Sequence, residues 1–135
     1  MKVLLIEDDP TMSDLLNLLL QPNQASVTVA TSDLEAIHKA HITQPDLIIV
    51  DHDGPVLDDW QICRSIRSIT TAPVLILSTQ ENPQEVANAL DAGADHFLTK
   101  PVTSGILLAT IKTLLRRKSI ALGHAFTWRE QYSFK

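Results

Sequence analysis

The sequence of 135 residues has little cysteine, few aromatic residues and no long apolar run. Because Cys63 is the one cysteine, an internal disulfide is excluded, and with it a small secreted scaffold stapled by disulfides. A transmembrane helix needs about 20 apolar residues, which no segment approaches, and the apolar run at 3–6 is interrupted by Glu7 too early for a signal peptide. We therefore expect one domain without membrane contact, located in the cytoplasm.

Basic residues are scarce in the first part of the chain. Residues 1–59 hold eleven of the sixteen acids and only two bases, Lys2 and Lys39, whereas the chain from Trp60 onward is net basic. Such a concentration of negative charge disfavours nucleic acid as a first partner and favours a bound cation. With no DNA-binding motif present, direct nucleic-acid binding is not indicated.

Short apolar runs alternate with segments of helical period. Continuous runs such as KVLLI and DLIIV are typical of strands covered on both faces in a parallel sheet. The expected strands are 2–6, 26–30, 46–50, 72–78 and 96–99, and the expected helices are 9–21, 32–42, 59–69, 82–93 and 101–118. Right-handed crossovers then favour an α/β fold, a (βα)5 doubly wound three-layer sandwich with a parallel, flavodoxin-like sheet order 2-1-3-4-5.

Acidic residues follow two of these strands. Glu7 and Asp8 come after the first, and Asp51 and Asp53 come after the third, so the topology brings both pairs to the switch point where ligands bind. Carboxylates this close raise one another's pKa unless a cation neutralises them, and Mg²⁺ with its oxygen ligands suits the cluster. Lys100 ends the fifth strand and would add an ammonium group to a site where an aspartate attacks phosphorus.

The motifs LLIEDDP, PDLIIVDHDGP, PVLILST and GADHFLTKP stand at these strand ends. In residues and spacing they resemble the receiver domain of two-component response regulators, of the chemotaxis-regulator type, across residues 1–118. The resemblance implies a signalling domain and not an enzyme, since a receiver catalyses only its own phosphorylation and dephosphorylation. It also implies a sensor histidine kinase or phosphotransfer protein as phosphodonor, and a downstream output domain or protein.

The same resemblance assigns the acids. Asp51 is expected to be the phosphoacceptor and a ligand of the cofactor Mg²⁺. Asp8 is expected to bind the metal directly and Glu7 mainly through water. Asp53 falls where the family offers a backbone carbonyl to the metal, so its side chain need not matter.

Four further positions match by resemblance. Ser78 corresponds to the residue that hydrogen-bonds the phosphoryl group, and Lys100 to the active-site lysine. Phe97 corresponds to the switch aromatic, which rotates when Ser78 and Lys100 move toward the phosphoryl group, so that the surface of the fourth helix, fifth strand and fifth helix changes. Pro101 corresponds to the proline that follows a cis peptide bond.

Several positions depart from the family pattern. Asp59 stands at a common glycine, Thr79 is larger than usual and is expected to slow phosphoryl exchange, and His52 borders the acceptor. The charged residues that join receivers of the winged-helix subclass are replaced here by His96, Ile106 and Thr110. A homodimer on this face would therefore depend on apolar contacts such as Ile106.

Two alternatives remain open from sequence. A degenerate receiver could act as an interaction module without phosphate, which Asp59 and Thr79 would favour. A haloacid dehalogenase-like phosphatase would use Asp51 as nucleophile and Asp53 as general acid, but Pro55 does not fit its signature and Glu7 has no role there. Residues 119–135, with four of the six aromatic residues, are expected to be a tail or linker or the start of an output domain.

Overall fold

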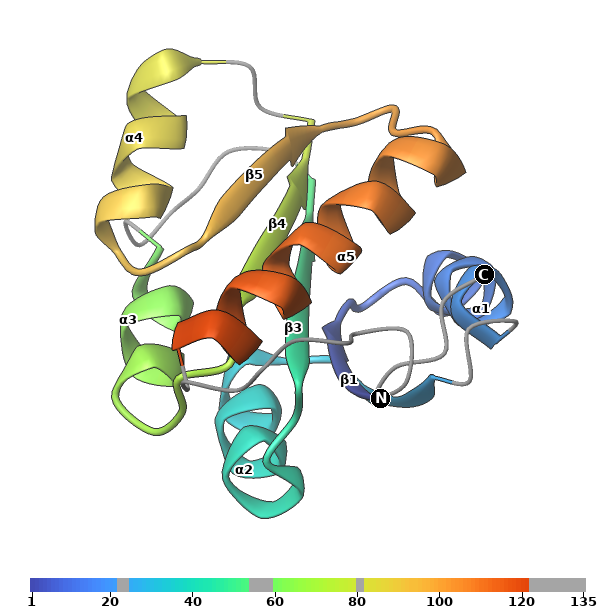
Figure 1. Cartoon of the computed structure of the whole chain (residues 1–135), viewed down its shortest axis with the longest axis horizontal. Coiled ribbons are helices and arrows are strands. Elements are labelled where there is room, and N and C mark those ends of the chain that lie inside the picture. Colours follow the sequence, from blue (N-terminus) through green and yellow to red (C-terminus); the bar gives the residue numbers. More distant parts are fainter. Residues whose placement is uncertain (22–24, 54–59, 80–81, 122–135) are drawn as a thin grey trace.

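A computed structural model describes residues 1–21, 25–53, 60–79 and 82–121 (Figure 1). The strands are β1 (Lys2–Ile6), β2 (Ser26–Ala30), β3 (Leu47–His52), β4 (Val74–Ser78) and β5 (His96–Thr99). The helices are α1 (Pro10–Leu20), α2 (Asp33–Thr43), α3 (Gln61–Arg67), α4 (Pro83–Asp91) and α5 (Ser104–Ala121). All strand pairs are parallel and the order is β2-β1-β3-β4-β5, so the predicted fold class and strand order are confirmed.

The sheet separates two apolar layers, because successive residues of a strand point to opposite faces. Leu4 and Ile6 of β1 pack into one core with the buried faces of α2, α3 and α4. Val3 and Leu5 pack into the other core with α1 and α5. Figure 1 shows the same division, with α2, α3 and α4 on one side of the sheet and α1 and α5 on the other. The predicted three-layer sandwich is therefore present.

Several helices begin at capping side chains. Asp9 accepts a hydrogen bond from the backbone of Thr11 at the start of α1, Ser32 caps α2, and Asn82 caps α4 ahead of Pro83. These side chains satisfy backbone N–H groups that have no partner inside the helix. The expected caps Ser32 and Asn82 are confirmed.

Some predicted bounds are wrong by two or three residues. Helix α3 begins at Gln61 and not at residue 59, because Trp60 has a left-handed backbone with φ 61° and lies outside the helix. Helix α5 begins at Ser104 and not at 101, and it extends three residues past 118 to Ala121. Its start follows Thr103, whose hydroxyl accepts the N–H of Ile106 at 3.3 Å. The described part of the chain contains no helix long and apolar enough to cross a bilayer.

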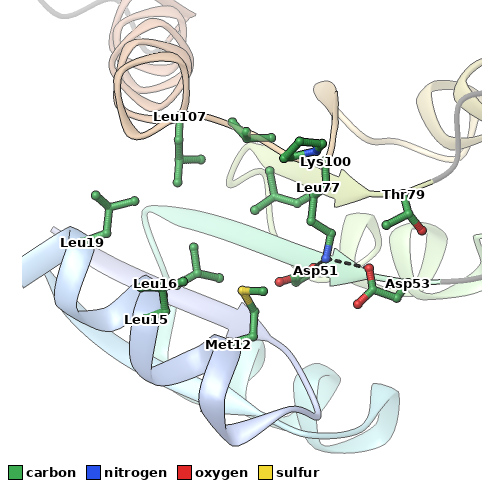
Figure 2. Close-up of a pocket in the computed structure, with 12 residues that line it drawn as sticks. Met12, Leu15, Leu16, Leu19, Asp51, Asp53, Leu77, Thr79, Lys100 and Leu107 are labelled. Carbon is green, nitrogen blue, oxygen red and sulfur yellow. Dashed lines mark hydrogen bonds and ion pairs between the residues drawn. The ribbon is translucent and has the colours of Figure 1, made fainter.

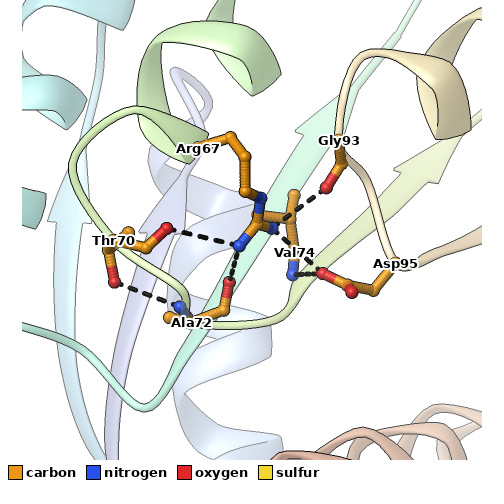
Figure 3. A network of polar contacts seen from close by, with 6 residues as sticks. All are labelled: Arg67, Thr70, Ala72, Val74, Gly93 and Asp95. Carbon is orange, nitrogen blue, oxygen red and sulfur yellow. Dashed lines mark hydrogen bonds and ion pairs between the residues drawn. The ribbon is translucent and has the colours of Figure 1, made fainter.

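A polar network joins two loops at the edge of the sheet where β4 and β5 begin (Figure 3). Arg67 is its centre, and the planar guanidinium donates in several directions at once. Its partners are the carbonyls of Thr70, Ala72 and Gly93 and the carboxylate of Asp95. That carboxylate also accepts the N–H of Val74 at 2.8 Å. The network fixes the ends of α3 and α4 to the two strands that follow them.

Candidate phosphoryl-acceptor site

Three strand ends supply the central side chains of the candidate site. Asp51 lies inside β3, since the strand continues to His52 and Asp51 pairs in register with Leu77 of β4. Glu7 follows β1, and its N–H bonds the carbonyl of Ala30 at 2.9 Å, which extends the pairing of β1 with β2. Lys100 follows β5. The carboxyl ends of parallel strands share one edge of the sheet, and this edge carries the acids and the lysine together.

Lys100 lies between two carboxylates, as Figure 2 shows. Its ammonium contacts Oδ1 of Asp51 and lies 2.8 Å from Oδ1 of Asp53. Burial of the ammonium lowers the pKa of Lys100, but the hydrogen bonds to Asp51 and Asp53 outweigh burial and raise it overall. The side chain of Lys100 is therefore protonated. Its backbone N–H bonds the carbonyl of Ser78 at 2.7 Å, which fixes where β5 ends relative to β4.

The carboxyl group of Glu7 is almost fully buried. Burial and a hydrogen bond with Asp51 raise the pKa of Glu7 to about 8, against the opposing effects of the Asp9 N–H and of Lys100. A buried carboxyl that faces a second carboxylate keeps its proton to a higher pH in this way. Glu7 and Asp51 are thus brought together, as the sequence predicts for these strand ends.

The donor set fits a hard divalent cation. Oδ2 of Asp51 is buried and, when Glu7 is ionised, has no hydrogen-bond donor among the described residues. Asp8 is exposed at the end of β1. Within the described ranges no three His, Cys, Asp or Glu side chains already form a ligand group. Mg²⁺ commonly uses only one or two carboxylates and completes its shell with water and phosphate oxygens, so an orphaned Asp51 oxygen beside Glu7 suits it.

The side chains expected to act as a switch come from β4 and β5, the two strands beside β3 on the far side from β1. Ser78 is fully buried at the end of β4, and it pairs in register with His52 and Thr99. Phe97 is partly buried against the core that contains Trp60, with the two rings edge to face and their centroids 5.9 Å apart. The imidazole of His52 meets the same indole at 5.5 Å. The peptide bond between Lys100 and Pro101 is cis.

A pocket of about 470 Å³ opens beside the acids (Figure 2). One wall is apolar and comes from α1, with Met12 and Leu15, and from the start of α5, with Leu107. Asp51, Asp53 and Lys100 also line the pocket, and so does Thr79. The pocket therefore reaches the Asp51 carboxylate from the side of the sheet that α1 and α5 cover. The expected effect of Thr79 on access remains a prediction.

The residues expected on a dimer surface share a second, shallower groove. His96, Ile106 and Thr110 line about 180 Å³ together with Arg117. Ile106 is 55% exposed, which leaves an apolar side chain free to make the contact that the sequence suggests. Asp59 and Pro55, on which two sequence arguments depend, lie outside the described residues.

Sequence reasoning missed two contributions to the site. For a receiver it gave Asp53 a role only through its backbone carbonyl, whereas the carboxylate of Asp53 contacts Lys100. The signal was available, because residues two apart in an extended segment point to the same side, and Asp53 follows Asp51 at that spacing. It also treated Trp60 as part of a helix, whereas Trp60 precedes α3 and its indole contacts both His52 and Phe97. No periodicity argument could have located that contact.

Comparison with known proteins gives a consistent picture. The family model of the response regulator receiver domain matches residues 3–112. Transcriptional regulatory protein CseB of Streptomyces avermitilis is 35% identical over 123 residues, which are 91% of this chain and 51% of CseB. Response regulator MprA of Mycobacterium leprae is 36% identical over 118 residues, which are 87% of this chain and 52% of MprA. The chain spans about half the length of the curated relatives it matches.

Solved structures of the same class superimpose well. A two-component response regulator from Clostridium difficile gives a TM-score of 0.80 at 33% identity, covering 87% of this chain and 98% of that one. The receiver domain of sensor histidine kinase PA1611 from Pseudomonas aeruginosa gives 0.72 at 25% identity, covering 84% and 96%. The PA1611 structure has a magnesium ion coordinated in its active site cleft.

Proposed function

The chain belongs to the response regulator receiver domain family, and from this premise we propose that Asp51 accepts a phosphoryl group from a sensor histidine kinase or a phosphotransfer protein. The observation that carries the proposal is the burial of Asp51 between the Glu7 carboxyl and the Lys100 ammonium at the carboxyl edge of the sheet. A buried carboxylate with a fixed cation on one side and an orphaned oxygen on the other is suited to attack an electrophilic phosphorus.

The transfer forms one bond and breaks one. An oxygen of Asp51 attacks phosphorus, the P–N bond of the phosphohistidine donor breaks, and the departing imidazole takes up a proton. Lys100 compensates the negative charge of the transferred group, and the hydroxyl of Ser78 donates a hydrogen bond to it. When bound, Mg²⁺ supplies further charge neutralisation, held by Asp8 and Asp51, by Glu7 through water and by the backbone carbonyl of Asp53.

Phosphorylation would then change a surface distant from Asp51. A phosphoryl group adds about two negative charges and three acceptor oxygens. Ser78 and Lys100 move toward it, and Phe97 turns into the space they leave, away from its edge-to-face contact with Trp60. The altered surface consists of α4, β5 and α5. It includes the groove around Ile106, where a partner or a second copy would bind.

The output activity would belong to a further domain outside this chain. CseB is named a transcriptional regulatory protein, and the chain spans about half its length. We accordingly assign residues 1–118 to the receiver, whose last helix continues to Ala121. The remainder of 119–135 would be a linker toward a transcriptional output domain, in a protein of the cytoplasm. DNA contacts would then fall to that output domain and not to the acidic region of this chain.

Phosphatase activity of the haloacid dehalogenase type is less well supported. That reaction needs a free general acid two residues after the nucleophile, and here the carboxylate of Asp53 is paired with Lys100. A phosphate-independent interaction module would not need the buried Glu7 and Asp51 pair. Both alternatives remain as outcomes of the experiment that tests the receiver function.

The decisive experiment follows covalent labelling of Asp51. Incubation with Mg²⁺ and a small phosphodonor such as acetyl phosphate should add the mass of one phosphoryl group to the wild type. Asp51→Asn should stay unlabelled under the same conditions. Labelling that persists in Asp51→Asn, or no labelling of a folded wild type, would overturn the proposal. Repeated turnover of phosphate esters would instead identify a phosphatase.

A further inference from the structure

The carboxylate of Asp53 lies 2.8 Å from the Lys100 ammonium. We propose that it holds the Lys100 ammonium beside Asp51 and takes up part of its positive charge, so that it restrains phosphorylation of Asp51. The inference rests on the proposed function, and it concerns the side chain of Asp53, whereas the metal site involves only its backbone carbonyl.

The geometry gives Lys100 two partners of different kinds. The side chain of Asp51 is 1% exposed and that of Asp53 is 67% exposed, and the ammonium of Lys100, at 14% exposure, contacts both. The buried partner is the acceptor itself. The exposed partner lies in water, so its pairing with the lysine is weaker than that of Asp51 and is screened by salt.

The charges around Lys100 do not balance. Asp51 and Asp53 bring two carboxylates to one ammonium, so both share a single cation. A phosphoryl group that arrives with about two negative charges must compete with Asp53 for this cation. It also meets the repulsion of the exposed Asp53 carboxylate, which salt screens because that side chain lies in water.

Removal of this charge should therefore accelerate phosphorylation. Asp53→Asn keeps the shape of the side chain and the backbone carbonyl, and it should raise the rate of labelling by acetyl phosphate about three- to tenfold at low ionic strength. The ratio of the Asp53→Asn labelling rate to the wild-type rate should approach one as the salt concentration rises. Asp53→Glu restores the charge and should return the rate toward that of the wild type.

A matched control separates this effect from a change in net charge. Asp91→Asn removes one exposed carboxylate from the last residue of α4, at the opposite edge of the sheet from Lys100. Its labelling rate should equal that of the wild type at every salt concentration. An equal acceleration in Asp91→Asn would overturn the inference, and so would an unchanged rate in Asp53→Asn.

A spectroscopic measurement tests the positioning without metal or phosphodonor. In metal-free protein the ¹⁵Nζ resonance of Lys100 and the ¹³Cγ resonance of Asp53 report the contact directly. Asp53→Asn should shift the Lys100 signal and broaden it by exchange with water, and Asp53→Glu should restore it. An unchanged Lys100 signal in folded Asp53→Asn would show that Asp53 does not hold the lysine.

The two measurements distinguish the inference from the proposed function. If neither the wild type nor any variant is labelled on Asp51, the proposed function is wrong. The inference that Asp53 restrains phosphorylation is then wrong as well. The Lys100 signal still decides in that case whether Asp53 positions the lysine. If the wild type is labelled but Asp53→Asn changes neither the rate nor the Lys100 signal, the receiver function stands and the inference is wrong.

Discussion

The indole of Trp60 meets the ring of Phe97 edge to face, with the two centroids 5.9 Å apart. The same indole also contacts the imidazole of His52, the residue after the proposed phosphoacceptor, with the centroids 5.5 Å apart. Trp60 is 2% exposed, so its surroundings are set by the protein and not by solvent. A movement of Phe97 therefore has a reporter inside the core.

The fluorescence of Trp60 should follow the switch. In a Trp128→Phe background, where Trp60 is the one remaining tryptophan, Mg²⁺ with beryllofluoride should change the emission intensity by a measurable fraction. Phe97→Leu should remove most of this change, because the aromatic edge no longer moves relative to the indole. Asp51→Asn serves as the control, since it should not respond to beryllofluoride at all. An equal response in Phe97→Leu would exclude Phe97 as the moving group.

Stability should depend on pH through Glu7. Its pKa is about 8 in the folded protein and near its ordinary value of 4.5 in the unfolded chain. The folded state therefore holds a proton that the unfolded state has lost, and this contribution to stability is complete below about pH 4.5 and disappears as pH rises through 8. Glu7→Gln lacks the titration. In Mg²⁺-free buffer the free energy of unfolding of Glu7→Gln minus that of the wild type should increase by on the order of 2 kcal/mol between pH 5 and pH 9.

Urea unfolding of the two proteins across this pH range checks the prediction. Asp14→Asn, on the exposed side of α1, is a control for the loss of one carboxylate and should follow the wild type. A difference between Glu7→Gln and wild type that stays constant with pH would mean that Glu7 is already ionised in the folded protein.

Affinity for Mg²⁺ should rise with pH over the same window. The cation must displace the proton that Glu7 shares with Asp51, so binding releases a proton at pH 6 and releases little above pH 9. Calorimetric titration in two buffers of different ionisation enthalpy measures both the affinity and the proton release. In Glu7→Gln the affinity should be weaker and nearly independent of pH. Proton release that is unchanged in this variant would contradict the assignment.

The network around Arg67 should contribute to stability and not to phosphorylation. Arg67→Ala leaves three backbone carbonyls and the Asp95 carboxylate without this donor, which should cost about 1–3 kcal/mol. Arg67→Lys keeps the charge but loses the planar fork, so we expect a smaller loss. Urea unfolding gives the free energies. The labelling rate of Asp51 in Arg67→Lys should stay within about twofold of wild type, because the network lies at the other edge of the sheet.

A substitution at Gly93 tests the same region through the backbone. Gly93 has φ +118°, where a side chain is strained, and an added Cβ would lie 3.3 Å from Cβ of Arg67. Gly93→Ala should therefore destabilise the protein by about 1–2 kcal/mol. In the Arg67→Ala background the Cβ atoms of residues 67 and 93 still lie close together. The remaining cost of Gly93→Ala should come mainly from its strained backbone. A neutral Gly93→Ala would show that this turn can adopt a different conformation.

Much of the architecture follows from local patterns in the chain. The apolar run at 2–6 coincides with β1, because a strand covered on both faces needs uninterrupted apolar residues. The more alternating segment at 26–30 coincides with the edge strand β2. Ser32 and Asn82 cap helices where side chains of this type are expected. The positions of Glu7, Asp51 and Lys100 at strand ends could likewise be predicted, since parallel strands bring their carboxyl ends to one edge.

The errors arose where tertiary contacts compete with local pattern. The strand β3 continues through Asp51 and His52, although charged residues disfavour a strand, because β4 pairs with both positions. Trp60 has a helix-compatible sequence neighbourhood but a left-handed backbone, and its indole is buried in contact with His52 and Phe97. Burial of one large aromatic side chain outweighs the cost of an unfavourable backbone conformation.

The sequence by itself determined the strand order, the family and the identity of the acids and the lysine, because periodicity and motif spacing are properties of the chain. Only the tertiary structure decided how these charges are shared. The proton on Glu7 and the division of Lys100 between Asp51 and Asp53 depend on burial and on distances of a few ångströms, and neither quantity can be read from residue order.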